Sequence, residues 1–276
     1  MALSAKITER ISAQIRKYSS EINSALTKDI NEADTCLIVR DMLCDVLGYD
    51  KTEITTEYAI KGTYADLAAE VDGSVRFLVE VKAVGISLRD LHVRQAVGYG
   101  ATQGTEWVVL TNGVHWKLYK IHFGQPIEKI LLCEIDILSS TPRSQKLAEA
   151  IECFGNLSRE HFSKDSMADY FEQKQLTSKF AIAAILLSEP ILTEIRRELR
   201  RLSPGLKIDV ESLELLLSDE VIKRELIESE DGKLASALVK RLQKAFAKER
   251  DRKEADSISD QSVNQGVAQP QQETPV

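Results

Sequence analysis

The chain has 276 residues, of which 43% are hydrophobic and 29% are charged, and its formal net charge at pH 7 is −7. This length can bury a sizeable core in one large domain or two small ones. The acidic balance argues against a protein that coats nucleic acid through bulk positive charge, although a nuclease with local DNA contacts is compatible with it. No apolar run reaches the roughly 18 residues that cross a bilayer, and the charged N-terminus shows no signal-peptide pattern. We therefore expect a cytoplasmic protein with no membrane partner.

The cysteines and histidines show no spacing that is typical of a metal site or a redox motif. There is no CxxC, HxxxH or HExxH pattern among Cys36, Cys44, Cys133, Cys153, His92, His115, His122 and His161. We expect unpaired, structural cysteines in a reducing compartment, and no zinc site.

The first 50 residues have a helical period. Residues 1–28 carry an apolar side chain every three or four positions, which predicts a helix. A second helix is predicted from about Glu32 to Leu47, with Asn31 as its N-cap and Gly48 as its C-terminal stop.

From Lys51 the period changes to two, which predicts strands. The predicted strands are 53–60, the two arms of a hairpin over 63–82, 105–111, 114–121 and 130–137, with a helix over 88–101 that Ser87 caps. The Asn112-Gly113 pair is a hairpin signal. This order of elements predicts an α/β (α+β) domain over residues 1–138.

Strand signals end after a Ser-Ser-Thr-Pro linker at 139–142. We expect an all-α domain over 143–254, with helices over 144–171, 176–202 and 210–252. Asp209 is the predicted N-cap of the last helix. The Ser-, Gln- and Pro-rich residues 255–276 are expected to be a disordered tail.

The hairpin over 63–82 has charged residues within an otherwise apolar run, where a buried strand normally has none. Asp66 lies in its first arm, and Glu80 and Lys82 end the apolar second arm. Burying an unpaired ion costs roughly several kcal/mol, so these charges suggest a site for a divalent metal. The alternative is that Asp66, Glu80 and Lys82 lie on the exposed face of an edge hairpin, with Glu80 and Lys82 as an ordinary ion pair.

The register of the hairpin decides whether the two acids meet. Glu80 and Lys82 are two residues apart and share one strand face. A two-residue turn at Asp72-Gly73 without a bulge places Asp66 opposite Val79, whereas a three-residue loop or a bulge places it opposite Glu80.

The helix after the hairpin adds two polar side chains. Leu88, Leu91, Gln95 and Tyr99 recur at helical spacing, and we expect them to face the sheet. Gln95 and Tyr99 there are either a hydrogen-bonded buried pair or donors that position a phosphate near Glu80.

Together these residues resemble the PD-(D/E)XK nuclease superfamily, and more narrowly the N-terminal nuclease domain of type I restriction enzyme R subunits (HsdR). The resemblance covers about residues 30–125 and implies a restriction-endonuclease-like mixed sheet flanked by helices. The matching segments are Leu47-Gly48-Tyr49, Glu57, Tyr64-Ala65-Asp66, Val79-Glu80-Val81-Lys82-Ala83, Gln95-Ala96-Val97-Gly98-Tyr99 and Thr111-Asn112-Gly113-Val114-His115-Trp116.

The resemblance also implies roles for residues. It makes Asp66, Glu80 and the Val81 carbonyl ligands of Mg²⁺, for which Mn²⁺ is an expected substitute. It makes Lys82 the catalytic lysine. The remaining implied members of the site are Gln95 and Tyr99 as a Q-x3-Y element, Glu32 as a helical acid near the metal, and Glu57 as a less secure addition.

One departure from the family limits the analogy. Type I R subunits carry an ATP-driven translocase, and this chain has no GxxxxGK[ST] loop. We expect a Mg²⁺-dependent endodeoxyribonuclease of restriction, defence or repair type, with DNA, other restriction or defence subunits and a second copy of the chain as candidate partners. The alternatives are an inactive nuclease-fold scaffold that binds DNA with a partner, and a helical interaction protein.

The helical region contains two basic segments, 196–201 and 240–253. They are either solvated helix faces or a surface that contacts phosphates. A third option for this region is dimerisation through its leucine-rich segment at 213–222.

Overall fold

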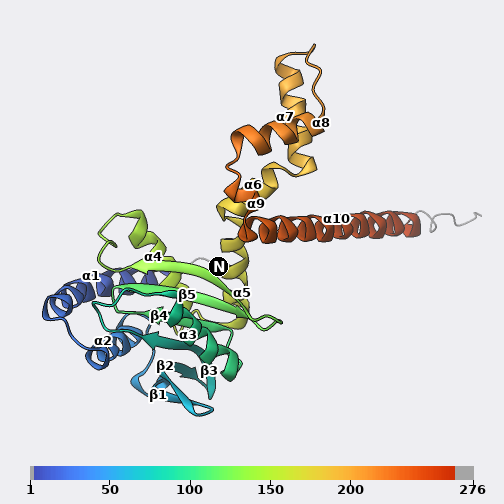
Figure 1. The fold of residues 1–276 in the computed structure, drawn as a ribbon. Helices are drawn as coiled ribbons and strands as arrows, with labels where there is room; N and C mark the ends of the chain where they lie inside the picture. The colour runs from blue at the N-terminus through green and yellow to red at the C-terminus, as the bar shows by residue number, and fades with distance from the viewer. Residues whose placement is uncertain (1–2, 265–276) are drawn as a thin grey trace, which may run out of the picture. The chain divides into compact units, whose positions relative to one another are not determined.

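The computed structural model describes the backbone of residues 3–264 and the side chains of 3–163 and 166–248. These residues form two compact units, 3–171 and 172–264, which are described separately (Figure 1). The first unit is built on a sheet and the second is helical.

One six-stranded mixed sheet forms the centre of the first unit, with its strands in sequence order. Its strands are β1 (Ile54–Ile60), β2 (Thr63–Val71), β3 (Ser74–Val81), β4 (Trp107–Thr111), β5 (His115–His122) and β6 (Glu128–Asp136). Neighbouring strands are antiparallel except β3 and β4, which are parallel and joined by the helix α3 (Asp90–Gln103). The predicted fold class, a mixed sheet flanked by helices and followed by a helical region, is confirmed.

One face of the sheet packs against α1 (Ala5–Lys28), α2 (Glu32–Asp45) and α4 (Gln145–Leu157). The helix predicted over residues 1–28 is confirmed as α1, and its periodic apolar residues Ile11, Ile15 and Ile22 are fully buried in this core. Asn31 caps α2 as predicted, since its side chain accepts a hydrogen bond from the Asp34 N–H. Gly48 has a φ of 82° shortly after α2 ends, a conformation that glycine adopts without strain.

The other face packs against α3, through a face of that helix that matches the predicted one only in part. Val93, Ala96 and Gly100 are its buried residues. Of the four residues predicted to face the sheet, Leu88 and Tyr99 pack against this core and are partly buried. Leu91 is 72% exposed and Gln95 is exposed, so the prediction is wrong for these two. The helix also begins at Asp90, beyond the predicted Ser87 cap. Small side chains let α3 lie close to the sheet, and this close packing determines which face is buried.

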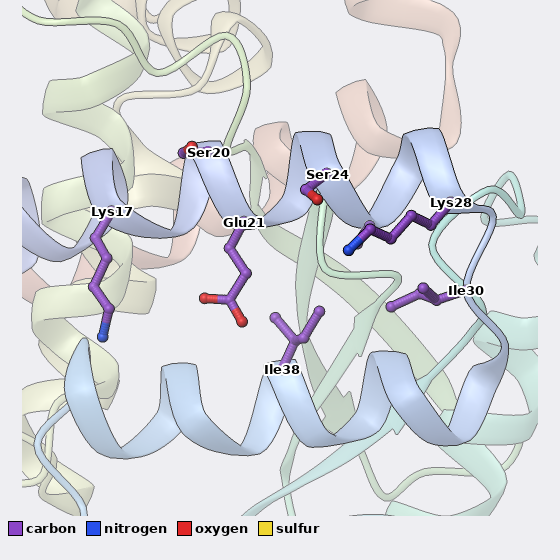
Figure 2. Close-up of a pocket in the computed structure, with 8 residues that line it drawn as sticks. Lys17, Ser20, Glu21, Ser24, Lys28, Ile30 and Ile38 are labelled. Atoms are coloured by element: carbon purple, nitrogen blue, oxygen red, sulfur yellow. The ribbon is translucent and has the colours of Figure 1, made fainter.

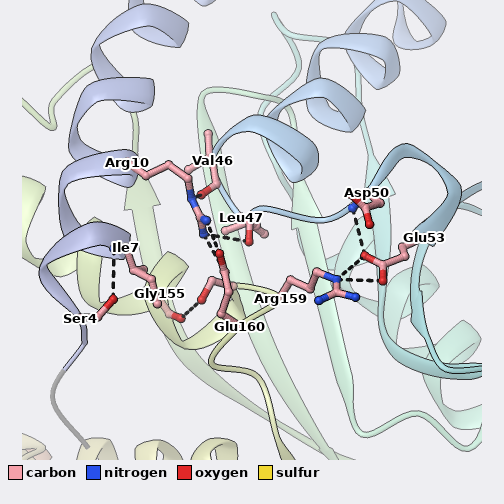
Figure 3. A network of polar contacts seen from close by, with 11 residues as sticks. Ser4, Ile7, Arg10, Val46, Leu47, Asp50, Glu53, Gly155, Arg159 and Glu160 are labelled. Carbon is pink, nitrogen blue, oxygen red and sulfur yellow. Dashed lines mark hydrogen bonds and ion pairs between the residues drawn. The ribbon is translucent and has the colours of Figure 1, made fainter.

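Arg10 of α1 and Glu53, just before β1, form ion pairs with the segment after α4 (Figure 3). The Arg10 guanidinium donates to the carbonyls of Val46 and Leu47, at 3.1 and 3.2 Å, and pairs with Glu160. Arg159 pairs with Glu53 at 2.7 Å. Through these contacts α1 and the chain that precedes β1 are held against residues more than 100 positions later.

The prediction of unpaired cysteines is wrong for two of the four. Cys133 in β6 and Cys153 in α4 form a disulfide, with their Cα atoms 6.5 Å apart. The packing of α4 on β6 brings them together, and no short sequence spacing signals it. Cys36 and Cys44 are free.

The second unit begins later than the sequence indicated. The predicted boundary lies at 139–142, whereas the first compact unit extends to Phe171 because α4 and part of α5 (Lys164–Leu176) pack into its core. The helices that follow are α6 (Lys179–Leu186), α7 (Glu189–Leu202), α8 (Val210–Leu216), a π-helical turn (Leu217–Val221), α9 (Glu225–Glu228) and α10 (Glu230–Asn264).

Details of this unit follow from its sequence. Asp209 caps α8 as predicted, accepting from the Ser212 N–H at 2.7 Å. The helix α10 extends ten residues into the segment expected to be disordered, and 265–276 lie outside the described residues. Across residues 3–264, no helix has the length and apolar character needed to cross a bilayer.

Replacing Gly100 with alanine tests the close approach of α3. A Cβ at Gly100 would overlap Ile121 and lie 2.7 Å from Val108, whereas a Cβ at Gly98 on the same helix meets nothing within 4 Å. We expect Gly100→Ala to lower the free energy of unfolding by about 1–3 kcal/mol through overpacking. Gly98→Ala should leave it unchanged or raise it by up to about 1 kcal/mol through helix propensity. Urea denaturation followed by circular dichroism measures both, and equal effects of the two changes would contradict the packing.

Candidate active site

The β2–β3 hairpin brings the predicted acids together through a bulge. The turn has two residues, Asp72 and Gly73, both with positive φ, and Val71 pairs with Ser74. One extra residue in β3 then shifts the register, so that Glu70 pairs with Val75 and Ala69 with Phe77. The bulge, and not a three-residue loop, meets the condition set by the sequence.

The shifted register places Asp66 opposite Glu80. Leu67 pairs with Val79, and the next pair in the same register is Asp66 with Glu80. The Asp66 Oδ2 atom accepts a hydrogen bond from the Val81 N–H at 2.6 Å. Asp66 is therefore fixed against the end of β3, beside Glu80.

Lys82 joins this pair of acids. Its Nζ atom lies 2.7 Å from Glu80 Oε1 and 3.3 Å from Glu32 Oε1. Only 2% of the Glu80 side chain and 13% of the Lys82 side chain are exposed. The second oxygen, Glu80 Oε2, is buried and has no hydrogen-bond partner within the part of the chain that the structure describes.

Burial and charge set the protonation states. Burial and the negative charge of Asp66 raise the pKa of Glu80 to about 7, although Lys82 opposes this change. Burial also raises the pKa of Asp66, against the opposing effect of the Val81 N–H. For Lys82, burial lowers the pKa, but the contact with Glu80 and the charges of Glu32 and Asp66 outweigh it, so the pKa lies above its ordinary value. Lys82 is a cation at neutral pH.

The first turn of α2 lies beside the end of β3. Glu32, its first residue, pairs with Lys82, and the Thr35 hydroxyl accepts a hydrogen bond from the Val84 N–H at 3.1 Å. The sequence predicted Glu32 as part of the site but gave no role to Thr35, which is buried.

Asn112 is a second residue whose role the sequence did not reveal. The Asn-Gly pair predicted a turn, and Asn112 does lie between β4 and β5. Its side chain is buried and donates to the Val84 and Ile86 carbonyls, at 3.4 and 2.8 Å, while accepting from two N–H groups of its own loop. It thereby fixes the segment that follows Lys82.

Gln95 and Tyr99 form a pair of their own. The Gln95 amide donates to the Tyr99 hydroxyl at 2.9 Å, and Gln95 is exposed. Among residues 3–264, no hydrogen bond or ion pair joins either side chain to Asp66, Glu80 or Lys82. Their part in the site stays a prediction.

Glu57 lies in a strained stretch of β1. Its φ is 49°, a value that residues other than glycine adopt at some cost. The pairing of Thr56 with Leu67 and of Tyr58 with Ala65 places it opposite Asp66. The strain therefore lies beside the acid at the centre of the site.

The oxygen donors fit magnesium better than a transition metal. Mg²⁺ prefers oxygen ligands and binds through one or two carboxylates, with water and substrate phosphates completing its shell. Asp66 and the unpartnered Glu80 Oε2 supply such donors. Within the described chain, no group of three or more His, Cys, Asp or Glu side chains is placed to hold a metal. Asp66, Glu80, the Val81 carbonyl and Glu32 all stay predicted ligands.

A groove elsewhere in the first unit is separate from this site. It has a volume of about 450 Å³ between α1 and α2 (Figure 2). Its lining residues are Lys17, Ser20, Glu21, Ser24, Ala25, Lys28, Ile30 and Ile38. None of them is among the predicted site residues, and Lys17 is already paired with Asp45 at 2.9 Å.

Comparison with known families identifies the central part of the first unit. Residues 38–131 match the family model of the type I restriction enzyme R protein N terminus (HSDR_N). The match covers about a third of the chain and includes Asp66, Glu80, Lys82, Gln95 and Tyr99, whereas Glu32 precedes it. No curated protein and no solved structure matches the chain. The HSDR_N family suggests a restriction-type nuclease, and the mixed sheet is consistent with a PD-(D/E)XK fold.

The stability of the metal-free protein should fall as pH rises through the titration of Glu80. The pKa is raised from 4.5 to about 7, so between these values the folded state holds a proton that the unfolded state has lost. Stability then decreases with pH across this window. Glu80→Gln removes the titration, and its stability relative to wild type should improve by about 2–3 kcal/mol between pH 5 and pH 8.

Urea denaturation in EDTA at several pH values measures this difference. Glu134→Gln is the matched control, because Glu134 pairs with Lys117 at 3.2 Å but its side chain is 49% exposed. Parallel pH curves for wild type and Glu80→Gln would contradict the buried, proton-binding state of Glu80.

Proposed function

We propose that the chain is a Mg²⁺-dependent endodeoxyribonuclease of restriction, defence or repair type, which hydrolyses phosphodiester bonds at Asp66, Glu80 and Lys82. The observation that carries the proposal is the register shift, which puts two carboxylates and a protonated lysine at one point of a family-matched sheet. Burying a charged side chain costs free energy unless the charge is paired with another group or coordinates a metal.

The two acids would hold the metal. Asp66 and Glu80 offer hard oxygen donors, and Glu80 Oε2 accepts no hydrogen bond from the residues that the structure describes. When bound there, Mg²⁺ supplies a Lewis acid for the phosphodiester, and Mn²⁺ is the expected substitute.

Lys82 would act as a fixed positive charge. Its raised pKa keeps the amine protonated at neutral pH, so it suits stabilisation of developing negative charge better than removal of a proton. Glu80 and Glu32 hold the ammonium group from two sides. We assign Glu32 to positioning Lys82.

Gln95 and Tyr99 would contact the DNA backbone. They present an amide and a phenol on α3, and such groups commonly contact phosphate oxygens. DNA is the proposed substrate, and other restriction or defence subunits and a second copy of the chain are the proposed partners. A cytoplasmic location stays a prediction.

Cleavage of plasmid DNA in Mg²⁺ tests the assignment. We expect wild type to nick or linearise the plasmid. Asp66→Ala and Lys82→Ala should each slow this reaction by about 10²–10³-fold, because each removes charge that the reaction uses. Single-turnover rates from gel analysis measure the effect.

Lys117→Ala is the matched control for Lys82→Ala. Lys117 also forms an ion pair with a glutamate on the sheet, in its case with Glu134 of the neighbouring strand. It should cut at the wild-type rate. Cutting that persists in both Asp66→Ala and Lys82→Ala would refute the proposed site.

The second candidate function is a DNA-binding scaffold of nuclease fold that acts with a partner. One observation favours it: Lys82 already pairs with both Glu80 and Glu32, which neutralises acids that a metal would otherwise attract. DNA binding that survives EDTA, with no cutting in Mg²⁺ or Mn²⁺, would support this candidate against the nuclease.

A further inference from the structure

Two basic segments of the second unit differ in how their charges are used. On α7, Arg197 pairs with Glu194 and Arg201 with Glu198 at 2.6 Å. Arg200 donates to the Ile208 carbonyl at 3.2 Å. Two of the four arginines of α7, Arg197 and Arg201, are therefore compensated by acids of the same helix.

Four basic residues of α10 have no such partner within the described part of the chain. Lys240, Arg241, Lys244 and Lys248 are exposed and form no ion pair or hydrogen bond with the described part of the chain. Residues 232–248 contain five basic residues and no acid. The fifth, Lys233, pairs with Glu230 at 2.9 Å.

The four free cations share one face of the helix. Lys240, Lys244 and Lys248 follow one another at four-residue intervals, which places them about 6 Å apart along one side of the axis. Arg241 lies three residues before Lys244 and seven before Lys248, on the same side. We call these four residues the basic stripe.

The opposite face of α10 is used for packing. Ala235 and Val239 are buried against α6, beside Phe180 and Ile185. A helix that packs through one face exposes the other, so the basic stripe is directed to solvent.

The basic stripe is locally unfavourable for the helix. Like charges at four-residue spacing destabilise a helix by about 0.2–0.5 kcal/mol per pair, and α7 shows how intervening acids prevent this. A polyanion with regularly spaced charges would relieve the repulsion. Duplex DNA carries one phosphate per about 3.4 Å on each strand, a spacing fine enough to meet every cation of the stripe.

We infer that the basic stripe of α10, formed by Lys240, Arg241, Lys244 and Lys248, is a second DNA-binding surface that contacts the phosphate backbone of duplex DNA. The choice of DNA rests on the proposed function, but binding through the stripe does not require cleavage. The contacts carry no sequence information, since phosphate contacts position a protein and base contacts specify the site. The stripe thus gives an acidic chain a local route to DNA.

The test compares two double variants of the full-length chain that lose the same charge. Lys240→Gln/Lys244→Gln removes two cations from the stripe, and Arg197→Gln/Arg201→Gln removes two compensated cations from α7. The affinity for a fluorescent 30-base-pair duplex is measured by anisotropy in EDTA, at salt concentrations from 50 to 200 mM. Circular dichroism melting checks that both variants are folded.

We expect only the stripe variant to bind more weakly. The slope of log K against log salt should fall by about two, because each phosphate contact contributes about 0.9 to it. The affinity ratio of wild type to variant should then shrink by roughly tenfold between 50 and 200 mM salt.

Three results would overturn the inference: unchanged DNA affinity in the stripe variant, equal losses in both variants, and absence of duplex binding by wild type. Binding of polyglutamate that depends on the same lysines, without binding of DNA, would assign the stripe to an acidic protein instead. The proposed nuclease is judged separately, because Lys82→Ala should lose cutting but keep DNA affinity in EDTA. The stripe variant at saturating DNA should keep the wild-type cutting rate.

Discussion

The register of a single hairpin determines whether this chain has a site at all. Side chains alternate between the two faces of a strand, so a shift of one residue changes which side chains meet. The extra residue in β3 moves Glu80 from a position beyond Asp66 to the position opposite it. The Asp72-Gly73 turn and the bulge thus act together: the turn closes the hairpin, and the bulge aligns the acids.

The burial of these aligned charges lowers the stability of the fold, and contacts from neighbouring elements keep the charged segment in place. Glu80 is almost fully buried, with one oxygen against Lys82 and the other unpartnered. A buried group left without a hydrogen bond costs about 1–3 kcal/mol. Thr35 and Asn112 form hydrogen bonds with the backbone just beyond Lys82 and so restrain the segment that follows the charged residues. Functional sites are often locally destabilising and are held in place by the surrounding structure.

Much of the fold could be predicted from the sequence, because local periodicity encodes it. Strong signals such as the helical period of α1 and the Asn31 cap specify elements within a few residues. The meeting of Asp66 and Glu80 could be stated as a condition on the hairpin. The sequence could not decide between a three-residue loop and a two-residue turn with a bulge, because both place the same apolar side chains on the same strand faces. The structure has the two-residue turn with a bulge.

The remaining differences arise from tertiary packing. The buried face of α3 follows the small residues Ala96 and Gly100, whereas a pattern based on large side chains pointed to Leu91 and Gln95. The Cys133–Cys153 disulfide depends on α4 lying on β6, and Thr35 matters only because the first turn of α2 lies beside the end of β3. No local sequence pattern carries these contacts.

The segment that matches the family model is shorter than the compact structural unit that contains it. The family match begins inside α2 and ends inside β6, at residues 38 and 131. The core of the sheet continues beyond both limits: Ile11 and Ile15 cover it from one side of the sequence, and Phe154 packs edge-on against Trp116 from the other. A fragment cut at the family limits would expose an apolar sheet face and lose Glu32. The compact unit that contains this core runs from α1 to Phe171, so the family match covers only the central part of the structural unit.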